Sequence, residues 1–317
     1  MKQAEKLILI VAIIVVIAST VSCIAALLSP PKPILPSAQQ LASLISGIPP
    51  VRPIPHIAVA YIRGTIAYSG DTLLTPSVGV EDYIKLLKEL AKSPQVEAVV
   101  VVIDSPGGDA SASYALYKAM CYLAKRKTVV VYTPGTLTSG AYMAALPAER
   151  IIASPTAIVG SIGVVAFIPK IGGLLSKLGV RVYVLHEGKL KAVGNPFTEN
   201  LTESERRVFM SIVNSTYNLF ISLVKKHRPN VSSIVFNSAP YPALKALKLG
   251  LIDGIGGLED AISVARKLAG LPSTTPVYNY RVHKPLIQQL LGAITLRETL
   301  TNIRLTSPRI LLIWPPP

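Results

Sequence analysis

The chain has 317 residues, of which 50% are apolar and only 15% are charged. This composition excludes an intrinsically disordered chain, and two cysteines exclude a disulfide-rich scaffold. Lys and Arg number 32 against 17 acidic residues, so the net charge is +15. The basic residues form no long run and have no interleaved aromatic motif. We therefore predict no nucleic-acid partner, and a basic surface that faces anionic lipid explains the charge as simply.

The amino-terminal residues predict a membrane anchor. Residues 7–28 read LILIVAIIVVIASTVSCIAALL and contain no charge. About 20 such residues span a bilayer as a helix, whereas the apolar region of a cleaved signal peptide is usually about 7–15 residues long. Lys2 and Lys6 precede the segment, and Lys32 is the only nearby cation after it. We therefore expect an uncleaved single-pass anchor in the cell membrane, with residues 1–6 in the cytoplasm and the remaining chain outside it.

A proline-rich linker, a globular domain and a tail follow the anchor. Prolines recur through residues 29–55, which predicts a stiff, extended spacer. Residues 56–270 alternate apolar runs with helical patterns, which is typical of an α/β domain with a largely parallel sheet. The tail, residues 271–317, is basic and apolar, and three roles for it stay open. It could pack on the domain or within an assembly, join subunits, or touch a membrane surface.

Within the domain, hydrophobic periodicity predicts the elements in chain order. Strands are expected at Ile57–Ile62, Val96–Ile103, Thr128–Tyr132, Ile151–Ala153 and Val180–Leu185. Helices are expected at 80–90, Ala110–Ala124, Ser139–Leu146, Ile171–Leu178, 202–226, 240–249 and 258–269.

Several kinds of chemistry have no sequence support. No GxxxxGK[ST] motif or well-placed GxGxxG is present, which argues against nucleotide phosphates. No HExxH or paired CxxC occurs, and the two cysteines lie far apart, which argues against a metal site. We therefore expect neither cofactor nor metal.

Two glycine-rich loops follow predicted strands and precede predicted helices. The first is DSPGGD, residues 104–109, and the second is GTLTSGAY, residues 135–142. Either loop could be an ordinary turn, and Ser139 could simply cap a helix. Alternatively, Ser139 presents its hydroxyl to a substrate while amides of both loops form an oxyanion hole. No histidine lies in a motif-like setting, so a lysine deprived of water is the alternative base. Lys189 and Lys191 share a strand face, and periodicity does not choose between them.

The order of five motifs resembles the signal peptide peptidase A family of serine proteases, in the ClpP/crotonase superfamily. The matching segments, between about His56 and Ala269, are IDSPGGD, TSGAYMAA, VGSIGVV, GKLKAVGNPFTENLTESER and LGLIDGIGG. The resemblance implies a fold of repeated β-β-α units. It also implies Ser139 as nucleophile, Lys191 as general base, Gly108 and Gly140 as oxyanion-hole residues, and Ser161 as the residue that positions the lysine.

The resemblance further implies the activity. Members of the family are membrane-anchored serine endopeptidases that cleave signal peptide remnants, need no metal or cofactor, and assemble into homo-oligomers. Half-length members complete each site with a lysine from a neighbouring subunit. Three alternatives remain: a related membrane protease that cleaves stomatin-like partners, a crotonase-type acyl-CoA enzyme, and an inactive scaffold on the same fold. The motifs around Lys191 disfavour the first, and an exported domain disfavours the second because acyl-CoA is cytosolic.

Overall fold

The computed structural model describes residues 13–20, 54–68, 71–72, 75–76, 79–282 and 309–313. The chain divides into two units, Met1–Pro53 and Ile54–Pro317. In the first unit, residues 13–20 are helical and exposed, and the rest of the predicted anchor and linker up to residue 53 lies outside the described residues. None of the described helices combines the length and the apolar character that crossing a bilayer requires. The anchor therefore stays a prediction.

The second unit is built on a six-stranded parallel sheet with the order β12-β8-β6-β4-β1-β13. Its central strands are runs of β-branched residues, which suit a sheet that is covered on both faces. The strands of this sheet are β1 His56–Arg63, β4 Val96–Asp104, β6 Thr128–Thr133, β8 Arg150–Ala153, β12 Gly254–Ile255 and β13 Val277–Tyr280.

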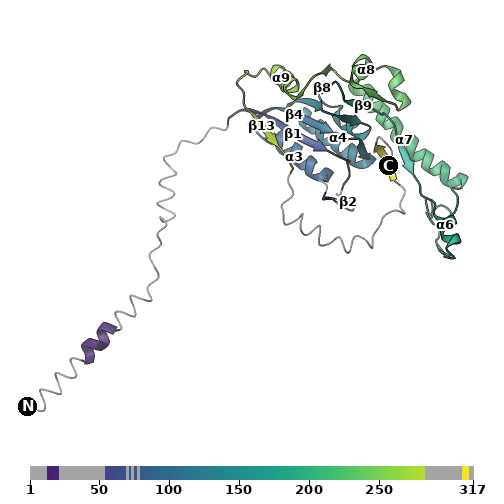
Figure 1. Cartoon of the computed structure of the whole chain (residues 1–317), viewed down its shortest axis with the longest axis horizontal. Helices are drawn as coiled ribbons and strands as arrows, with labels where there is room; N and C mark the ends of the chain where they lie inside the picture. The colour runs from purple at the N-terminus through teal and green to yellow at the C-terminus, as the bar shows by residue number, and fades with distance from the viewer. Residues whose placement is uncertain are drawn as a thin grey trace, which may run out of the picture. The chain divides into compact units, whose positions relative to one another are not determined.

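Helices cover both faces of this sheet (Figure 1). Alternate residues of β4 point to opposite faces, as the period of a strand requires. Val99, Val101 and Ile103 join the larger core, with α3, α4 and α5, while Val100 and Val102 face α9. The helices are α3 Val80–Lys92, α4 Ala110–Ala124, α5 Gly140–Ala145, α6 Gly172–Lys177, α7 Glu203–His227, α8 Ala243–Lys248 and α9 Leu258–Leu268, with a 3-10 helix, η1, at Ser233–Asn237.

Short strands form three smaller sheets, with the orders β11-β9-β7, β10-β14-β5 and β2-β3. They are β2 Asp71–Thr72, β3 Thr75–Pro76, β5 Gly107–Asp109, β7 Thr136–Thr138, β9 Ile158–Gly160, β10 Val165–Phe167, β11 Pro240–Pro242 and β14 Arg309–Ile313. The successions β4-β5-α4 and β6-β7-α5 are β-β-α units, in which the second strand leaves the main sheet. The mixed α/β fold with a parallel sheet is thus confirmed.

One predicted strand is wrong. Residues 180–185 form no strand, and the segment is exposed, with Tyr183 at 80% and Leu185 at 95% exposure. The apolar, β-branched pattern that predicts the strand is real, but no strand among the described residues pairs with the segment. A strand needs a neighbouring strand to pair its backbone groups and burial for its apolar side chains.

Candidate active site

Ser139 occupies a strained turn between β7 and α5. Its backbone has φ 54° and ψ −122°, a left-handed conformation that costs a residue with a Cβ of the order of 1–3 kcal/mol. Two hydrogen bonds hold the turn: the Ser139 amide donates to the Gly160 carbonyl at 2.7 Å, and the Met143 amide donates to the Ser139 carbonyl at 3.0 Å. The serine is only 2% exposed. A strained strand-to-helix turn of this kind is how α/β hydrolases present a nucleophilic serine.

Gly108 lies in β5, and its backbone is in close contact with the backbone of Ile66. A Cβ on Gly108 would come within 2.1 Å of the Ile66 carbonyl oxygen, so only glycine fits here. The Ile66 amide donates to Gly107 and the Asp109 amide donates to Ile66, each at 2.8 Å. Because peptide groups alternate in direction along a strand, the N–H and C=O of Gly108 itself face away from Ile66. This amide is therefore directed to the other edge of β5.

The loop before β5 is tied to the strand that ends at Ser139. The Ser105 amide donates to Thr136 at 2.8 Å, and the Thr138 amide donates to Ser105 at 3.3 Å. Gly140, the first residue of α5, has an amide without an i−4 partner in the helix, as at every helix start. The two predicted oxyanion-hole glycines thus flank Ser139 on adjoining segments.

Ser161 lies beside Ser139. Strands β7 and β9 run parallel, and their last residues, Thr138 and Gly160, lie opposite each other. Ser139 and Ser161 are the residues that directly follow the two strands. Ser161 is also left-handed, with φ 52°, and is buried. Its amide donates to the Ala239 carbonyl at 3.1 Å. The structure therefore brings Ser139, Gly140 and Ser161 together at the ends of strands β7 and β9, with Gly108 in β5 next to α5.

Lys191 does not join this group within a single chain. It lies in the irregular segment between α6 and α7, is exposed, and has a backbone hydrogen bond to Gly188. In the described part of the chain, no hydrogen bond links its ammonium group to Ser139 or Ser161. A cavity of about 450 Å³ beneath this segment is lined by Lys189 and not by Lys191. The buried lysine that the sequence analysis expects as general base is thus not formed at Lys191 within this chain.

The histidines in the described residues have partners away from Ser139. His56 contacts the Ile54 carbonyl and the Tyr280 hydroxyl, His227 contacts the Tyr117 hydroxyl, and His186 contacts the Gly188 carbonyl. His283 lies outside the described residues. This arrangement agrees with the expectation that histidine is not the base.

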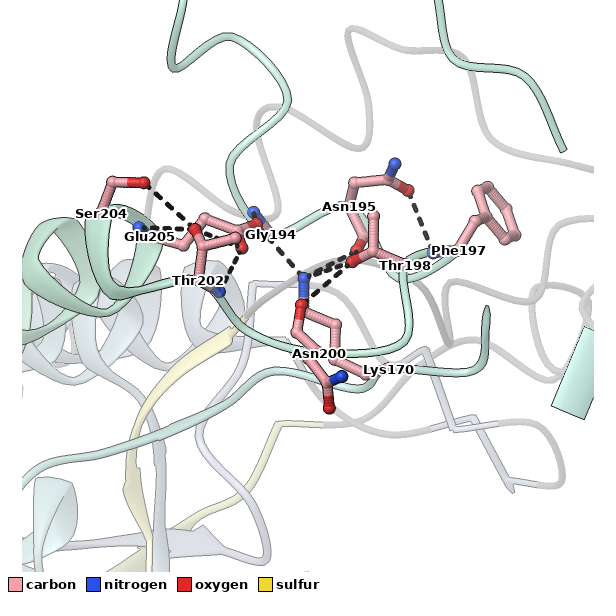
Figure 2. Close-up of polar contacts among 9 residues, drawn as sticks. All are labelled: Lys170, Gly194, Asn195, Phe197, Thr198, Asn200, Thr202, Ser204 and Glu205. Atoms are coloured by element: carbon pink, nitrogen blue, oxygen red, sulfur yellow. Dashed lines mark hydrogen bonds and ion pairs between the residues drawn. The ribbon is translucent and has the colours of Figure 1, made fainter. Parts of the chain in front are cut away.

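A buried ion pair fixes the segment that carries Lys191, and sequence reasoning did not identify it. The Lys170 ammonium donates to the Glu205 carboxylate at 3.2 Å and to the Asn195 carbonyl at 3.0 Å, and both charged side chains are 11% exposed (Figure 2). The same carboxylate accepts hydrogen bonds from the amides of Gly194 and Thr202. Figure 2 shows these groups converging from the end of the loop and the first turn of α7. The sequence signal was the capping-box spacing of Thr202 and Glu205.

These contacts set the charge state of Glu205. Burial by itself would raise the pKa of the carboxyl, but hydrogen bonds from Thr202, Gly194 and Lys170 outweigh it and hold the pKa at about 2. The carboxylate is therefore ionised at neutral pH. Its folded pKa lies below the ordinary 4.5, so the stability that it contributes is complete above about pH 5 and is lost as the pH falls toward 2.

We predict that Glu205→Gln destabilises the domain. The change leaves the buried Lys170 ammonium without its counter-charge, which costs about 3 kcal/mol or more. For a domain of this size, that loss lowers Tm by roughly 6–12 °C. Thermal unfolding followed by circular dichroism at pH 7 measures the difference, which should shrink between pH 5 and pH 2 as the native carboxylate is protonated.

Glu203→Gln, in the same helical turn, is the control. Glu203 forms an exposed pair with Arg206 at 3.9 Å, and exposed pairs contribute little. Its Tm should stay close to that of the unaltered chain. Equal Tm values for the Glu205 and Glu203 variants would show that the buried pair does not hold the segment.

Comparisons with known proteins identify the family of this chain. The model of peptidase family S49 matches residues 122–272, and the Clp protease model matches residues 76–159. A protein of Synechocystis sp. that is named as a protease is 31% identical over 228 residues, which cover 70% of this chain and 82% of that protein. A protein of Methanocaldococcus jannaschii that is named as a protease is 39% identical over 192 residues, which cover 60% of this chain and 61% of that protein.

Among solved structures, ClpP1 of Listeria monocytogenes has a TM-score of 0.42 and 14% identity, over 64% of this chain and 94% of that chain. The mixed α/β fold and the family matches define a member of a serine-type protease family. The chain belongs to peptidase family S49, and the predicted membership of the signal peptide peptidase A family is confirmed. The chain spans less than two thirds of the length of the M. jannaschii relative.

Proposed function

We propose that the chain is a membrane-anchored serine endopeptidase that hydrolyses apolar peptides, signal peptide remnants among them. The observation that carries this proposal is the position of Ser139. It is a buried serine in a strained turn, with Gly108 and Gly140 on adjoining segments and Ser161 beside it. Membership of family S49 supports the same activity.

In the proposed reaction, Ser139 Oγ attacks the carbonyl carbon of the substrate while a neutral Lys191 accepts the hydroxyl proton. The amides of Gly108 and Gly140 stabilise the resulting oxyanion. Collapse of the tetrahedral intermediate breaks the C–N bond, and Lys191 returns the proton to the departing amine. Water then attacks the acyl-enzyme by the same route, and the peptide acid and the free serine are released. Ser161 positions the lysine during both halves.

The proposed site is completed by a second copy of the chain. Lys191 is exposed in one subunit, and the segment before it carries exposed apolar side chains at Val180, Val182, Tyr183 and Leu185. An interface that covers this segment would bury apolar area, provide a strand partner for residues 180–185, and remove water from the lysine. A homo-oligomer with shared sites follows from this proposal, as does a peptidase domain that faces outward from the membrane.

The proposal predicts a pH profile. A lysine accepts a proton only in its neutral form, and lysine in contact with water stays protonated below about pH 10, whereas burial lowers its pKa. We expect kcat/KM to rise from acid to neutral or alkaline pH, in the range where Glu205 is already ionised. The measurement is hydrolysis of a fluorogenic peptide between pH 4 and pH 10. A maximum below about pH 5 contradicts a lysine base.

The experiment that tests the proposed activity is incubation of the purified chain with casein and with an apolar fluorogenic peptide. Mass spectrometry of the products should show cleavage at internal peptide bonds. The size of the assembly is measured in parallel, because the monomer is expected to be inactive. A folded homo-oligomer that cleaves neither substrate overturns the proposal.

A further inference from the structure

The carboxy-terminal tail enters the candidate active site as a strand. Strand β14, Arg309–Ile313, pairs antiparallel with β5 along one edge and with β10 along the other. The sheet order β10-β14-β5 means that the tail separates two strands that do not pair with each other. In Figure 1 it is the yellow strand next to the mark of the C-terminus. Of the three roles left open for the tail, packing on the domain therefore holds for this segment.

The register places the tail at the oxyanion hole. Leu312 pairs with Gly108, and Leu311 pairs with Asp109. Ile66 bonds to Gly107 and Asp109 along one edge of β5. The N–H and C=O of Gly108 are directed to the other edge and face the backbone of Leu312. Helix α5, which begins directly after Ser139, lies beside both β5 and β14. The tail backbone thus lies where the carbonyl of a bound peptide would have to lie.

The second edge of the tail is also paired. Leu311 lies opposite Val165, and Arg309 lies opposite Phe167 in β10. Successive residues of a strand direct their backbone groups to opposite edges, so Leu311 is directed to β10 while Leu312 is directed to β5. An extended segment held on both edges is the geometry of peptide recognition by strand addition. The segment reads RILLI, and an apolar sequence is what the proposed activity requires of a substrate.

We propose that β5 and β10 are the two walls of the peptide-binding groove, and that residues 309–313 of the same chain are its resting occupant. The groove takes an extended apolar peptide as an antiparallel strand, and substrate enters only when the tail leaves. This inference rests on the proposed peptidase function for its biological meaning. The occupancy itself is measured without any cleavage.

The test is peptide binding to the full chain and to a chain that ends at Thr306, both carrying Ser139→Ala. The probe is a fluorescein-labelled peptide with the sequence of residues 307–314, SPRILLIW, measured by fluorescence anisotropy. The shortened chain should bind at least tenfold more tightly, because its groove is vacant. The same peptide with Pro at the position of Leu312 lacks the N–H directed to β5 and should not bind. Equal binding of the first peptide to both chains overturns the proposal.

A second pair of variants keeps the tail and guards against misfolding of the shortened chain. Leu312→Pro removes one backbone donor and should release the tail, which opens the groove to the probe. Leu312→Val retains the donor and suits a strand, so it should leave the groove closed. Hydrogen exchange at the amide of Gly108, which is directed to β14, provides an independent measurement. Exchange should accelerate in Leu312→Pro and stay slow in Leu312→Val, and identical exchange in the two variants overturns the proposal.

With Ser139 restored, the shortened chain should cleave the fluorogenic peptide with at least tenfold higher kcat/KM than the full chain. The two proposals fail in different ways. If binding follows the expected pattern and no chain cleaves peptide, the peptidase function is wrong and the groove stands. If the full and shortened chains both cleave with the same kcat/KM and bind the probe equally, the occupant is wrong and the peptidase stands.

Discussion

Replacing Ser139 by alanine is expected to abolish peptide hydrolysis while the fold stays intact. Loss of the nucleophile should lower kcat by at least about 10⁴-fold, as removal of a serine nucleophile does in other serine proteases. The strained backbone at φ 54° is no worse for alanine, since both residues carry a Cβ. The hydrogen bonds that hold the turn come from the backbone and remain. Hydrolysis of the fluorogenic peptide and thermal unfolding are measured on the same preparation.

Ser113→Ala is the matched control. Ser113 is equally buried, in α4, and its hydroxyl has no hydrogen-bond partner among the described residues. Its loss should leave kcat/KM unchanged and should not lower Tm, because an unsatisfied buried hydroxyl is removed. Substantial turnover by a well-folded Ser139→Ala chain would contradict the assignment of Ser139 as the nucleophile. Equal loss of activity in both variants would point to damage of the fold.

Lys191→Ala is also expected to abolish activity, and mixing should restore part of it. A general base contributes about 10²–10⁴-fold, so the variant by itself should be nearly inactive. If the lysine acts on the serine of a neighbouring subunit, co-assembled Ser139→Ala and Lys191→Ala chains contain interfaces that pair an intact serine with an intact lysine. Random mixing in equal amounts makes such interfaces about a quarter of the total in a closed ring. We therefore expect about a quarter of the normal activity per chain.

The mixing experiment needs proof of co-assembly. The two variants carry different tags, and sequential affinity steps isolate only mixed assemblies. Lys189→Ala is the control for the choice of lysine, because Lys189 lines the neighbouring cavity and precedes Lys191 by two residues. It should retain most of the activity. Verified mixed assemblies without activity would place serine and lysine in one chain and would leave the chemical roles of both residues intact.

Local sequence patterns predicted most of the large elements. Helix α4 has the predicted bounds, and strands β4 and β6 agree with the prediction within one residue. Continuous β-branched runs and 3.6-residue periodicity are properties of neighbouring residues along the chain, so the sequence is enough to predict these elements. The short strands β5, β7 and β9 were not predicted. They have three residues each, are rich in Gly and Thr, and exist because neighbouring segments pair with them.

For the site, the sequence by itself predicted which residues carry the chemistry, since the motifs around Gly108, Ser139, Ser161 and Lys191 place each in a recognisable local setting. Only the tertiary structure decided which of them meet. It assembled Ser139 with Ser161 through a strand pair, left Lys191 in solvent, and brought Leu312 to Gly108 across about two hundred residues of chain. The reason is physical. Backbone pairing between distant segments requires two strand edges whose N–H and C=O groups are in register, and it requires that water be excluded from both edges. The few residues of a motif encode neither condition.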